Sequence, residues 1–149
     1  NSNKLNFQIR NSEVLDLFSG SGSFGLECIS RGADKVFFVE NYPPVLEILK
    51  RNLSKLTKDN QHKIFYDDCF NFIENFSDKN QEFDIIFIDA PFKEKKIDLL
   101  VEVIIKKKIL KKNGKIILHK HKKDIMKISD RFKISDQRVY GVSKIIFGN

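Results

Sequence analysis

The sequence predicts a single α/β domain, built on a mainly parallel sheet that ends in an antiparallel hairpin. Short runs rich in β-branched residues and phenylalanine alternate with longer amphipathic stretches along all 149 residues, a pattern typical of βαβ units. Several of these runs lack polar alternation, which indicates strands buried on both faces. The composition, 41% hydrophobic and 32% charged, is that of a soluble globular domain, and no apolar run is long enough to span a membrane.

Five strands are expected from the apolar runs: Glu13–Phe18, Lys35–Glu40, Lys63–Tyr66, Phe83–Ile88 and Lys115–His119. Four helices are expected between them: Ser23–Arg31, Pro43–Leu56, Cys69–Asn75 and Lys95–Leu110. The two prolines that open the second helix cost no hydrogen bond there.

The end of the chain is expected to differ from the βαβ units that precede it. Asn113–Gly114 is typical of a residue pair that closes a helix, with glycine at the C′ position before the next strand. A short helix is expected near Lys123–Ser129. Two further strands, Phe132–Val139 and Val142–Phe147, would then pair as a hairpin that turns tightly at Tyr140–Gly141.

A glycine-rich turn follows the first strand. Gly20-x-Gly22-x-x-Gly25 leads from that strand into a helix, and glycine there permits positive φ and close approach of a ligand to the backbone. The next strand ends at Glu40, where a carboxylate can accept both ribose hydroxyls of an adenosine. By itself this arrangement fits a dinucleotide site as well.

Asp16 distinguishes between the two cofactor classes. An acid beside the turn would repel a diphosphate, whereas S-adenosylmethionine presents a sulfonium and an ammonium group. Asp16-x-Phe18 before the glycines therefore favours a cationic amino-acid tail. At the end of the third strand, Asp68 can accept from an adenine amino group while the Cys69 N–H donates to the ring. Asp68 also fits the N-cap of the helix that follows, and both roles can coexist.

The fourth strand ends in Asp89-Ala90-Pro91-Phe92, at the carboxyl edge where open α/β sheets bind ligands. This segment resembles the (Asn/Asp)-Pro-Pro-(Tyr/Phe) motif of methyltransferases that act on exocyclic or amide nitrogens. Asp89 and the carbonyl of residue 90 can hold the hydrogens of a base amino group, and Phe92 can stack on the base. Ala90 stands where the motif has proline, so we expect a softer loop. A turn that is merely capped by Asp89 is the less favoured interpretation.

From Glu13 to Phe147, the order of motifs resembles bacterial 16S rRNA guanine-N2 methyltransferases. The motifs are Asp16–Gly25, Glu40, Asp68, Asp89–Phe92 and Arg138-Val-Tyr-Gly141. The resemblance implies a Rossmann-like, doubly wound sheet of seven strands in the order 3-2-1-4-5-7-6. It also implies S-adenosylmethionine as cofactor and methyl transfer to a guanine 2-amino group in small-subunit rRNA, free or within an immature small subunit. Because the family has further residues upstream and this chain begins at Asn1, we expect that an N-terminal segment is missing.

The expected functional residues follow from these motifs. Those expected in catalysis are Asp89, Ala90, Pro91 and Phe92. Those expected to bind the cofactor are Asp16, Phe18, Ser19, Gly20, Ser21, Gly22, Glu40, Asn41, Asp68, Cys69 and Asp89. Three other functions stay open. A DNA adenine amino methyltransferase shares the motif, but no inserted target-recognition domain is visible. A nicotinamide-dependent oxidoreductase is disfavoured by Asp16, and a non-catalytic RNA-binding module would require activity lost at Ala90.

Positive charge is concentrated in the second half of the chain. Residues 76–149 carry eighteen Lys and Arg against nine in residues 1–75, and the net charge is +7. From Lys106 to Lys123 there are nine lysines and no acid. Such a stretch fits a phosphate-binding surface or a solvated face equally well.

Histidines and cysteines give weaker signals. His119 and His121 lie two apart without a third ligand nearby, so we expect no metal and a solvent-facing or RNA-facing role for both. Cys28 and Cys69 lack metal-ligand spacing and fit reduced core thiols of a cytoplasmic protein. We expect a monomer.

Overall fold

The computed structural model describes residues 9–56, 59–91, 94–124 and 127–149. One seven-stranded sheet runs through the molecule in the order β3-β2-β1-β4-β5-β7-β6, which confirms the Rossmann-like prediction and its strand order. The strands are β1 (Glu13–Leu17), β2 (Lys35–Glu40), β3 (His62–Tyr66), β4 (Phe83–Ile88), β5 (Leu110–His121), β6 (Ile134–Tyr140) and β7 (Ser143–Gly148). The helices are α2 (Ser23–Ser30), α3 (Pro43–Leu56), the 3-10 turn η1 (Asp59–Gln61), α4 (Cys69–Glu74) and α5 (Ile97–Lys107). None of the described helices is long and apolar enough to cross a membrane.

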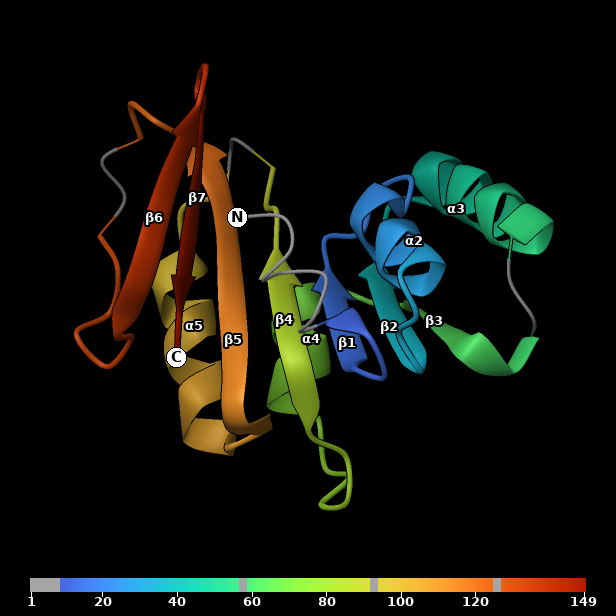
Figure 1. Ribbon diagram of the computed structural model, residues 1–149, viewed down its shortest axis with the longest axis horizontal. Coiled ribbons are helices and arrows are strands. Elements are labelled where there is room, and N and C mark those ends of the chain that lie inside the picture. Colours follow the sequence, from blue (N-terminus) through green and yellow to red (C-terminus); the bar gives the residue numbers. More distant parts are fainter. Residues whose placement is uncertain (1–8, 57–58, 92–93, 125–126) are drawn as a thin grey trace.

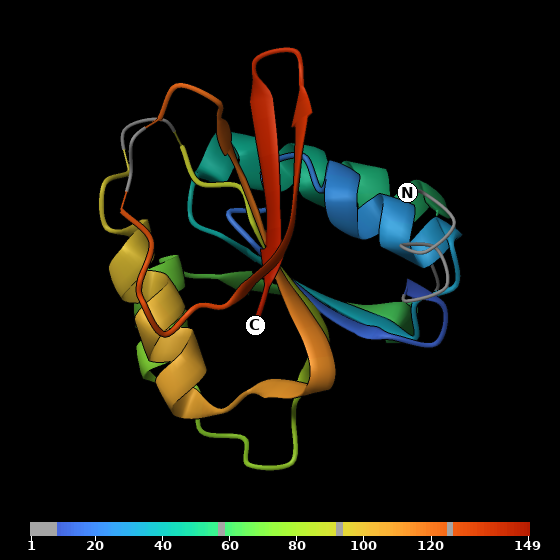
Figure 2. The ribbon, with the colours of Figure 1, turned by 60° about the vertical axis from the view of Figure 1, so that its left-hand side comes forward.

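Helices cover both faces of the parallel half of the sheet, as Figures 1 and 2 show. Side chains alternate along β1, so that Val14 joins the core under α2 and α3, while Leu15 and Leu17 join the core under α4 and α5. Every one of these three side chains is fully buried. Asp16 follows the same alternation and therefore points toward α2.

The C-terminal hairpin extends the sheet in the opposite strand sense. Strand β7 pairs antiparallel with both β5 and β6, and β6 forms the edge of the sheet. Tyr140 is paired with Ser143, so Gly141 and Val142 form a two-residue turn with Gly141 at φ 58°. Glycine at the first central position with positive φ is the usual solution for such a turn, and the predicted hairpin is confirmed.

The expected end of the last helix was wrong. Helix α5 stops at Lys107, where Lys108 adopts a left-handed conformation (φ 56°), and the chain enters β5 by Leu110. This early exit places the Ile109 side chain in the core, and the Ile109 carbonyl accepts the Phe83 N–H at 2.7 Å. Asn113–Gly114 lies inside β5, next to the register shift between β4 and β5, and does not cap a helix.

The short helix expected near Lys123–Ser129 is also wrong for the part that the structure describes. Residues 122–123 form a turn, and residues 127–129 have no regular structure. Two positions of this segment, Ile125 and Met126, lie outside the described residues. Lys122 donates its N–H to the Val142 carbonyl at 2.7 Å, so this turn is fastened to the hairpin instead.

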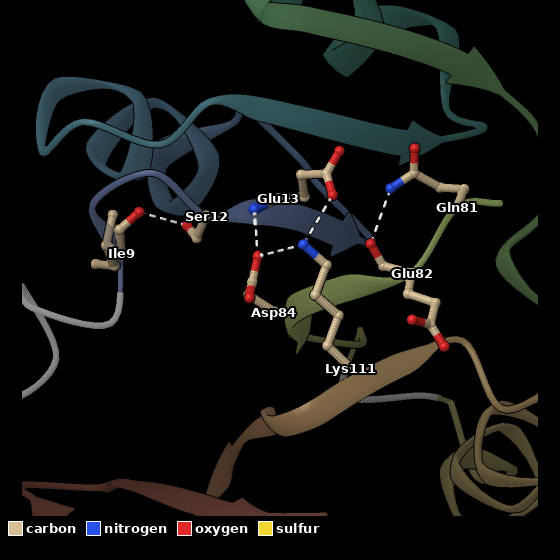
Figure 3. A network of polar contacts seen from close by, with 7 residues as sticks. All are labelled: Ile9, Ser12, Glu13, Gln81, Glu82, Asp84 and Lys111. Carbon is tan, nitrogen blue, oxygen red and sulfur yellow. Dashed lines mark hydrogen bonds and ion pairs between the residues drawn. The ribbon is translucent and has the colours of Figure 1, made fainter.

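A polar network joins the amino ends of β1, β4 and β5 (Figure 3). Lys111 Nζ lies 3.0 Å from Glu13 Oε2 and 3.2 Å from Asp84 Oδ2. Asp84 Oδ2 also accepts the Glu13 N–H at 2.8 Å, and the Ser12 hydroxyl donates to the Ile9 carbonyl. The hydrogen bonds that Lys111 donates to Glu13 and, to a lesser extent, to Asp84 raise its pKa above its usual range. This edge of the sheet is held by paired charges.

Candidate active site

A cleft of about 770 Å³ opens at the carboxyl ends of β1, β2 and β4. It brings together the three acids predicted from the strand ends, Asp16, Glu40 and Asp89. Of the other predicted residues, it is lined by Phe18, Ser19, Gly20, Ser21, Asn41, Asp68, Ala90 and Pro91. Its volume lies within the ~300–1,000 Å³ that is usual for small-ligand sites.

The turn after β1 has a backbone that ordinary residues rarely adopt. Phe18 and Gly20 both have positive φ, at 56° and 57°. Ser19 fixes this turn to the next strand, because its N–H donates to the Val39 carbonyl and its hydroxyl oxygen accepts the Val39 N–H, both at 3.0 Å. Further on, a Cβ at Gly25 would lie 2.3 Å from the Phe38 ring, so glycine lets α2 settle against β2.

Glu40 joins two walls of the cleft, the loop after β2 and the glycine turn. Its Oε1 accepts the Gly20 N–H at 2.8 Å, and its Oε2 accepts the N–H groups of Asn41 and Tyr42 at 3.0 Å. Since a carboxylate offers about four acceptor positions, three are used within the protein and about one remains for a ligand hydroxyl. Glu40 therefore shapes the cleft as well as lining it.

Asp16 forms the floor of the cleft. Only 1% of it is exposed, and its Oδ2 accepts the Gly25 N–H at 3.2 Å. Burial raises the pKa of Asp16 well above its usual range; the Gly25 N–H lowers it, and Asp89 and Glu40 raise it further. A positive charge in the cleft would stabilise the ionised form of this buried acid.

Asp68 takes the capping position that was one of its two expected roles. Its Oδ2 accepts the Asn71 N–H at 3.0 Å, at the start of α4. The adjacent Cys69 is buried below the turn, where its sulfur accepts the Phe18 N–H at 3.2 Å. Cys69 and Gly22 are thus the predicted cofactor residues that the cleft does not include among its lining.

His119 makes a contact that the sequence did not predict. Its Nδ1 lies 2.9 Å from Asp89 Oδ1, and its Nε2 lies 2.9 Å from Ser143 Oγ. His119 thus contacts the predicted catalytic acid, while its predicted solvent-facing or RNA-facing role stays a prediction. His121, two residues further along β5, accepts the Lys123 N–H at 3.1 Å.

A second, smaller cavity of about 140 Å³ lies on the other side of Asp89. The two cavities share Asp89, Ala90, Pro91 and Glu94, so the motif after β4 forms the partition between them. Its fourth predicted residue, Phe92, lies outside the described residues. The partition gives the larger and the smaller cavity a common wall.

Sequence reasoning missed six residues that line the larger cleft: Ser23, Phe24, Tyr42, Val45, Phe87 and Glu94. Phe24 could have been noticed, because it is an aromatic residue within a glycine turn. Its ring stacks on that of Phe87 from β4, with centroids 3.9 Å apart and an angle of 11° between planes. The other five have no local signature.

The charge of the larger cleft is opposite to that of the whole protein. Its described lining contains five acids, Asp16, Glu40, Asp68, Asp89 and Glu94, and no lysine, arginine or histidine. The chain as a whole carries a net charge of +7. Such a lining attracts cations and repels a diphosphate, so it disfavours a dinucleotide.

The acid-free stretch from Lys106 to Lys123 does not form one surface. It runs along the length of β5, roughly 30 Å from end to end, and its lysines divide between the two edges of the sheet. Lys111 is paired at the amino edge, as described above, whereas Lys120, Lys122 and Lys123 lie at the carboxyl edge beside His119. Within the described part of the chain, no three His, Cys, Asp or Glu side chains are grouped as metal ligands would be.

Comparison with known proteins identifies the family. The family model described as conserved hypothetical protein 95 matches residues 2–149. The chain belongs to this family. A ribosomal RNA small subunit methyltransferase D of Haemophilus influenzae is 30% identical over 136 residues, which cover 90% of this chain and 69% of that protein. The family resemblance drawn from the motifs is thereby confirmed.

Two further proteins illustrate the extent of the likeness. The enzyme of the same name from Buchnera aphidicola subsp. Baizongia pistaciae is 36% identical over 113 residues, 76% of this chain. That match spans 56% of the Buchnera protein, just over half its length. Among solved structures, a putative methylase from Haemophilus influenzae superposes with a TM-score of 0.83 at 29% identity, covering 99% of this chain and 91% of that one.

Proposed function

We propose that this protein transfers a methyl group from S-adenosylmethionine to the exocyclic 2-amino group of a guanine in small-subunit (16S) rRNA. One observation carries the proposal: Asp89-Ala90-Pro91 separates a cation-attracting cleft from a second cavity at the same sheet edge. The names of the relatives, ribosomal RNA small subunit methyltransferase D, support rRNA as the substrate class.

The residues of the cleft fit S-adenosylmethionine. Glu40 retains an acceptor position for a ribose hydroxyl, and Asp68 retains Oδ1 for an adenine amino group. The buried carboxylate of Asp16 below the glycine turn suits the positive charges of the methionine part. When bound, the cofactor supplies a methyl group on a positively charged sulfur. A nicotinamide dinucleotide would have to place its diphosphate against the same acids, which argues against an oxidoreductase.

The role of the protein in the transfer is to hold the acceptor nitrogen. Its lone pair is delocalised into the ring, so the amino group is a poor nucleophile. Asp89 and the carbonyl of residue 90 accept its two N–H groups and direct the lone pair toward the larger cleft, so positioning supplies much of the acceleration. The nitrogen–carbon bond forms as the carbon–sulfur bond breaks, and the amino proton then leaves to solvent. No separate base is required, because this proton becomes acidic only after the transfer.

The decisive experiment maps methylation in rRNA from cells with and without this protein. We expect loss of a single N2-methylguanine from small-subunit rRNA, identified by mass spectrometry, and its return with the wild-type gene but not with Asp89→Ala. In vitro transfer to naked 16S rRNA and to immature small subunits identifies the form of the substrate. Methylation of adenine in DNA, or an unchanged set of rRNA modifications, would contradict the proposal.

A further inference from the structure

The three side chains Asp89, His119 and Ser143 form a hydrogen-bonded row across the carboxyl edge of the sheet. They come from three neighbouring elements: the residue after β4, strand β5 and the start of β7. The β4–β5 register pairs Ile88 with Leu118, so Asp89 and His119 are the next residues along the two strands. Strand pairing therefore brings the three residues side by side.

The two hydrogen bonds favour one tautomer of a neutral imidazole ring. An ionised carboxylate can only accept, so His119 Nδ1 carries the proton that is donated to Asp89 Oδ1. In a neutral ring the other nitrogen is then an acceptor, and Ser143 donates its hydroxyl hydrogen to Nε2. Ser143 thus donates to His119, and His119 donates to Asp89.

The row occupies only one oxygen of the catalytic acid. Asp89 is about half exposed, with 48% of its side chain accessible, so burial alone does not fix its rotamer. Among the residues that the structure describes, none hydrogen-bonds its Oδ2. His119 thus holds Oδ1 and leaves Oδ2 available to an incoming N–H group, at the partition that the two cavities share.

We propose that His119 is a positioning residue for the methyl transfer: it fixes the Asp89 carboxylate in the orientation in which Oδ2 accepts a hydrogen of the target amino group, and Ser143 fixes His119 in turn. This inference rests on the proposed function, and it assigns a role to a side chain that the motif itself does not include.

The test compares variants of His119 in single-turnover methyl transfer. His119→Leu removes both hydrogen bonds, and we expect a rate about 10- to 100-fold lower because a misplaced contact costs up to about 10² in rate. Cofactor affinity, measured by calorimetry, should stay within about twofold of wild type. His119→Asn should recover most of the rate, because its amide nitrogen occupies nearly the place of Nδ1. His119→Gln, whose amide reaches the place of Nε2, should recover little.

Ser143→Ala tests the outer half of the row, with Ser135→Ala as matched control. The Ser135 hydroxyl, on the adjacent strand β6, donates to the Phe147 carbonyl at 3.2 Å and has no bond to His119. We expect a loss of about two- to fivefold in rate for Ser143→Ala and none for Ser135→Ala. A wild-type rate in His119→Leu, or equal losses in His119→Asn and His119→Leu, would overturn the proposal.

A measurement without methyl transfer separates this inference from the proposed function. Nitrogen-15 spectra of the imidazole should show His119 protonated at Nδ1 in the wild type, and a change of tautomer or of shift in Asp89→Ala. A ring protonated only at Nε2 would disprove the row even if the enzyme is active. Conversely, an inactive wild type with the Nδ1-protonated ring would reject the proposed function and confine His119 to a structural contact.

Discussion

The two edges of the parallel sheet use their acids in opposite ways. At the amino edge, Glu13 and Asp84 share the ammonium group of Lys111. At the carboxyl edge, Glu40 and Asp16 accept main-chain N–H groups alone among the described residues, from the loops and from helix α2 beside the cleft. The lysine already balances the two acids at the amino edge, whereas a positive charge in the cleft would stabilise the ionised form of buried Asp16 at the carboxyl edge. The acids are thus paired within the protein where strands are joined, and they line a cleft where a cationic ligand would bind.

The largest effect is expected from Asp89→Ala at the carboxyl edge. It removes the proposed acceptor for the target amino group but no part of the glycine turn, so transfer should slow by roughly 10²–10³ while the fold and cofactor binding persist. Asp89→Asn should be milder, because the amide oxygen still accepts. Single-turnover kinetics with rRNA or immature subunits measures the transfer rate, and calorimetry measures cofactor binding. Near wild-type turnover in Asp89→Ala would show that the amino group is held elsewhere.

The next effect is on cofactor affinity at Glu40. Glu40→Ala removes the proposed acceptor for the ribose and also frees the N–H groups of Gly20, Asn41 and Tyr42, so the loops lose their shared anchor. We expect S-adenosylmethionine to bind about 10- to 100-fold more weakly, as hydrogen bonds to a charged group contribute about 1.5–3 kcal/mol each. Glu40→Gln keeps one oxygen acceptor, so its cofactor affinity should lie between those of the wild type and Glu40→Ala. Calorimetry that finds equal affinity in Glu40→Ala, or tight NAD binding by the wild type, would contradict the cofactor assignment.

A third prediction compares lysines of the same acid-free stretch at the two edges. Charge reversal at Lys120, Lys122 and Lys123 should weaken RNA binding and flatten its dependence on salt, by up to about 0.7–0.9 in the log–log slope for each phosphate group that is no longer bound. The matched control reverses Lys106, Lys112 and Lys115, which lie toward the amino edge. RNA affinity is measured at salt concentrations from about 50 to 300 mM, and the salt slopes of the two triple variants are compared. Equal slopes in both triple variants would indicate a solvated face only.

Asp16→Asn should raise stability and weaken cofactor binding. The amide oxygen still accepts the Gly25 N–H, but no buried charge has to form. The pKa of Asp16 is raised in the folded state, so Asp16 contributes favourably to the free energy of unfolding only at low pH. This contribution is lost as pH rises from 3.8, the ordinary pKa of an aspartate, through the folded-state pKa. The variant should therefore unfold at a higher Tm than wild type at pH 7, and the difference should shrink toward pH 4. Thermal scans across that range measure it, and a variant less stable at pH 7 would refute the argument.

The smallest effect is expected at the amino edge. Lys111→Met should lower the free energy of unfolding by about 1 kcal/mol or less, because the ammonium group is partly exposed. Its raised pKa means that this stability is present below about pH 10.5 and disappears as pH rises through the folded-state pKa. Urea unfolding at pH 7 and above pH 11 tests this, and methyl transfer should be unchanged. A loss of activity in Lys111→Met would break the contrast between the two edges.

Most of the fold and the core of the site could be predicted from the sequence because their signals are local. Buried parallel strands are short apolar runs, and the residues that follow them meet at one edge, so the sequence alone could place Asp16, Glu40 and Asp89 together. Asn113–Gly114 was misinterpreted for the same reason: a local helix-ending signal was weaker than the need of the core for Ile109 and Leu110.

The sequence by itself determined the alternation of strands and helices, the glycine turn and the identity of the acids at the strand ends, and the family resemblance added the order of strands in the sheet. Only the tertiary structure decided what each acid touches. His119 lies 30 positions after Asp89, and Asp84 lies 71 positions after Glu13, so no spacing pattern links either pair. Periodicity shows which face or edge a side chain occupies, but a hydrogen bond also requires the register between neighbouring strands and the rotamers of both partners. Those are settled only when the whole sheet is assembled.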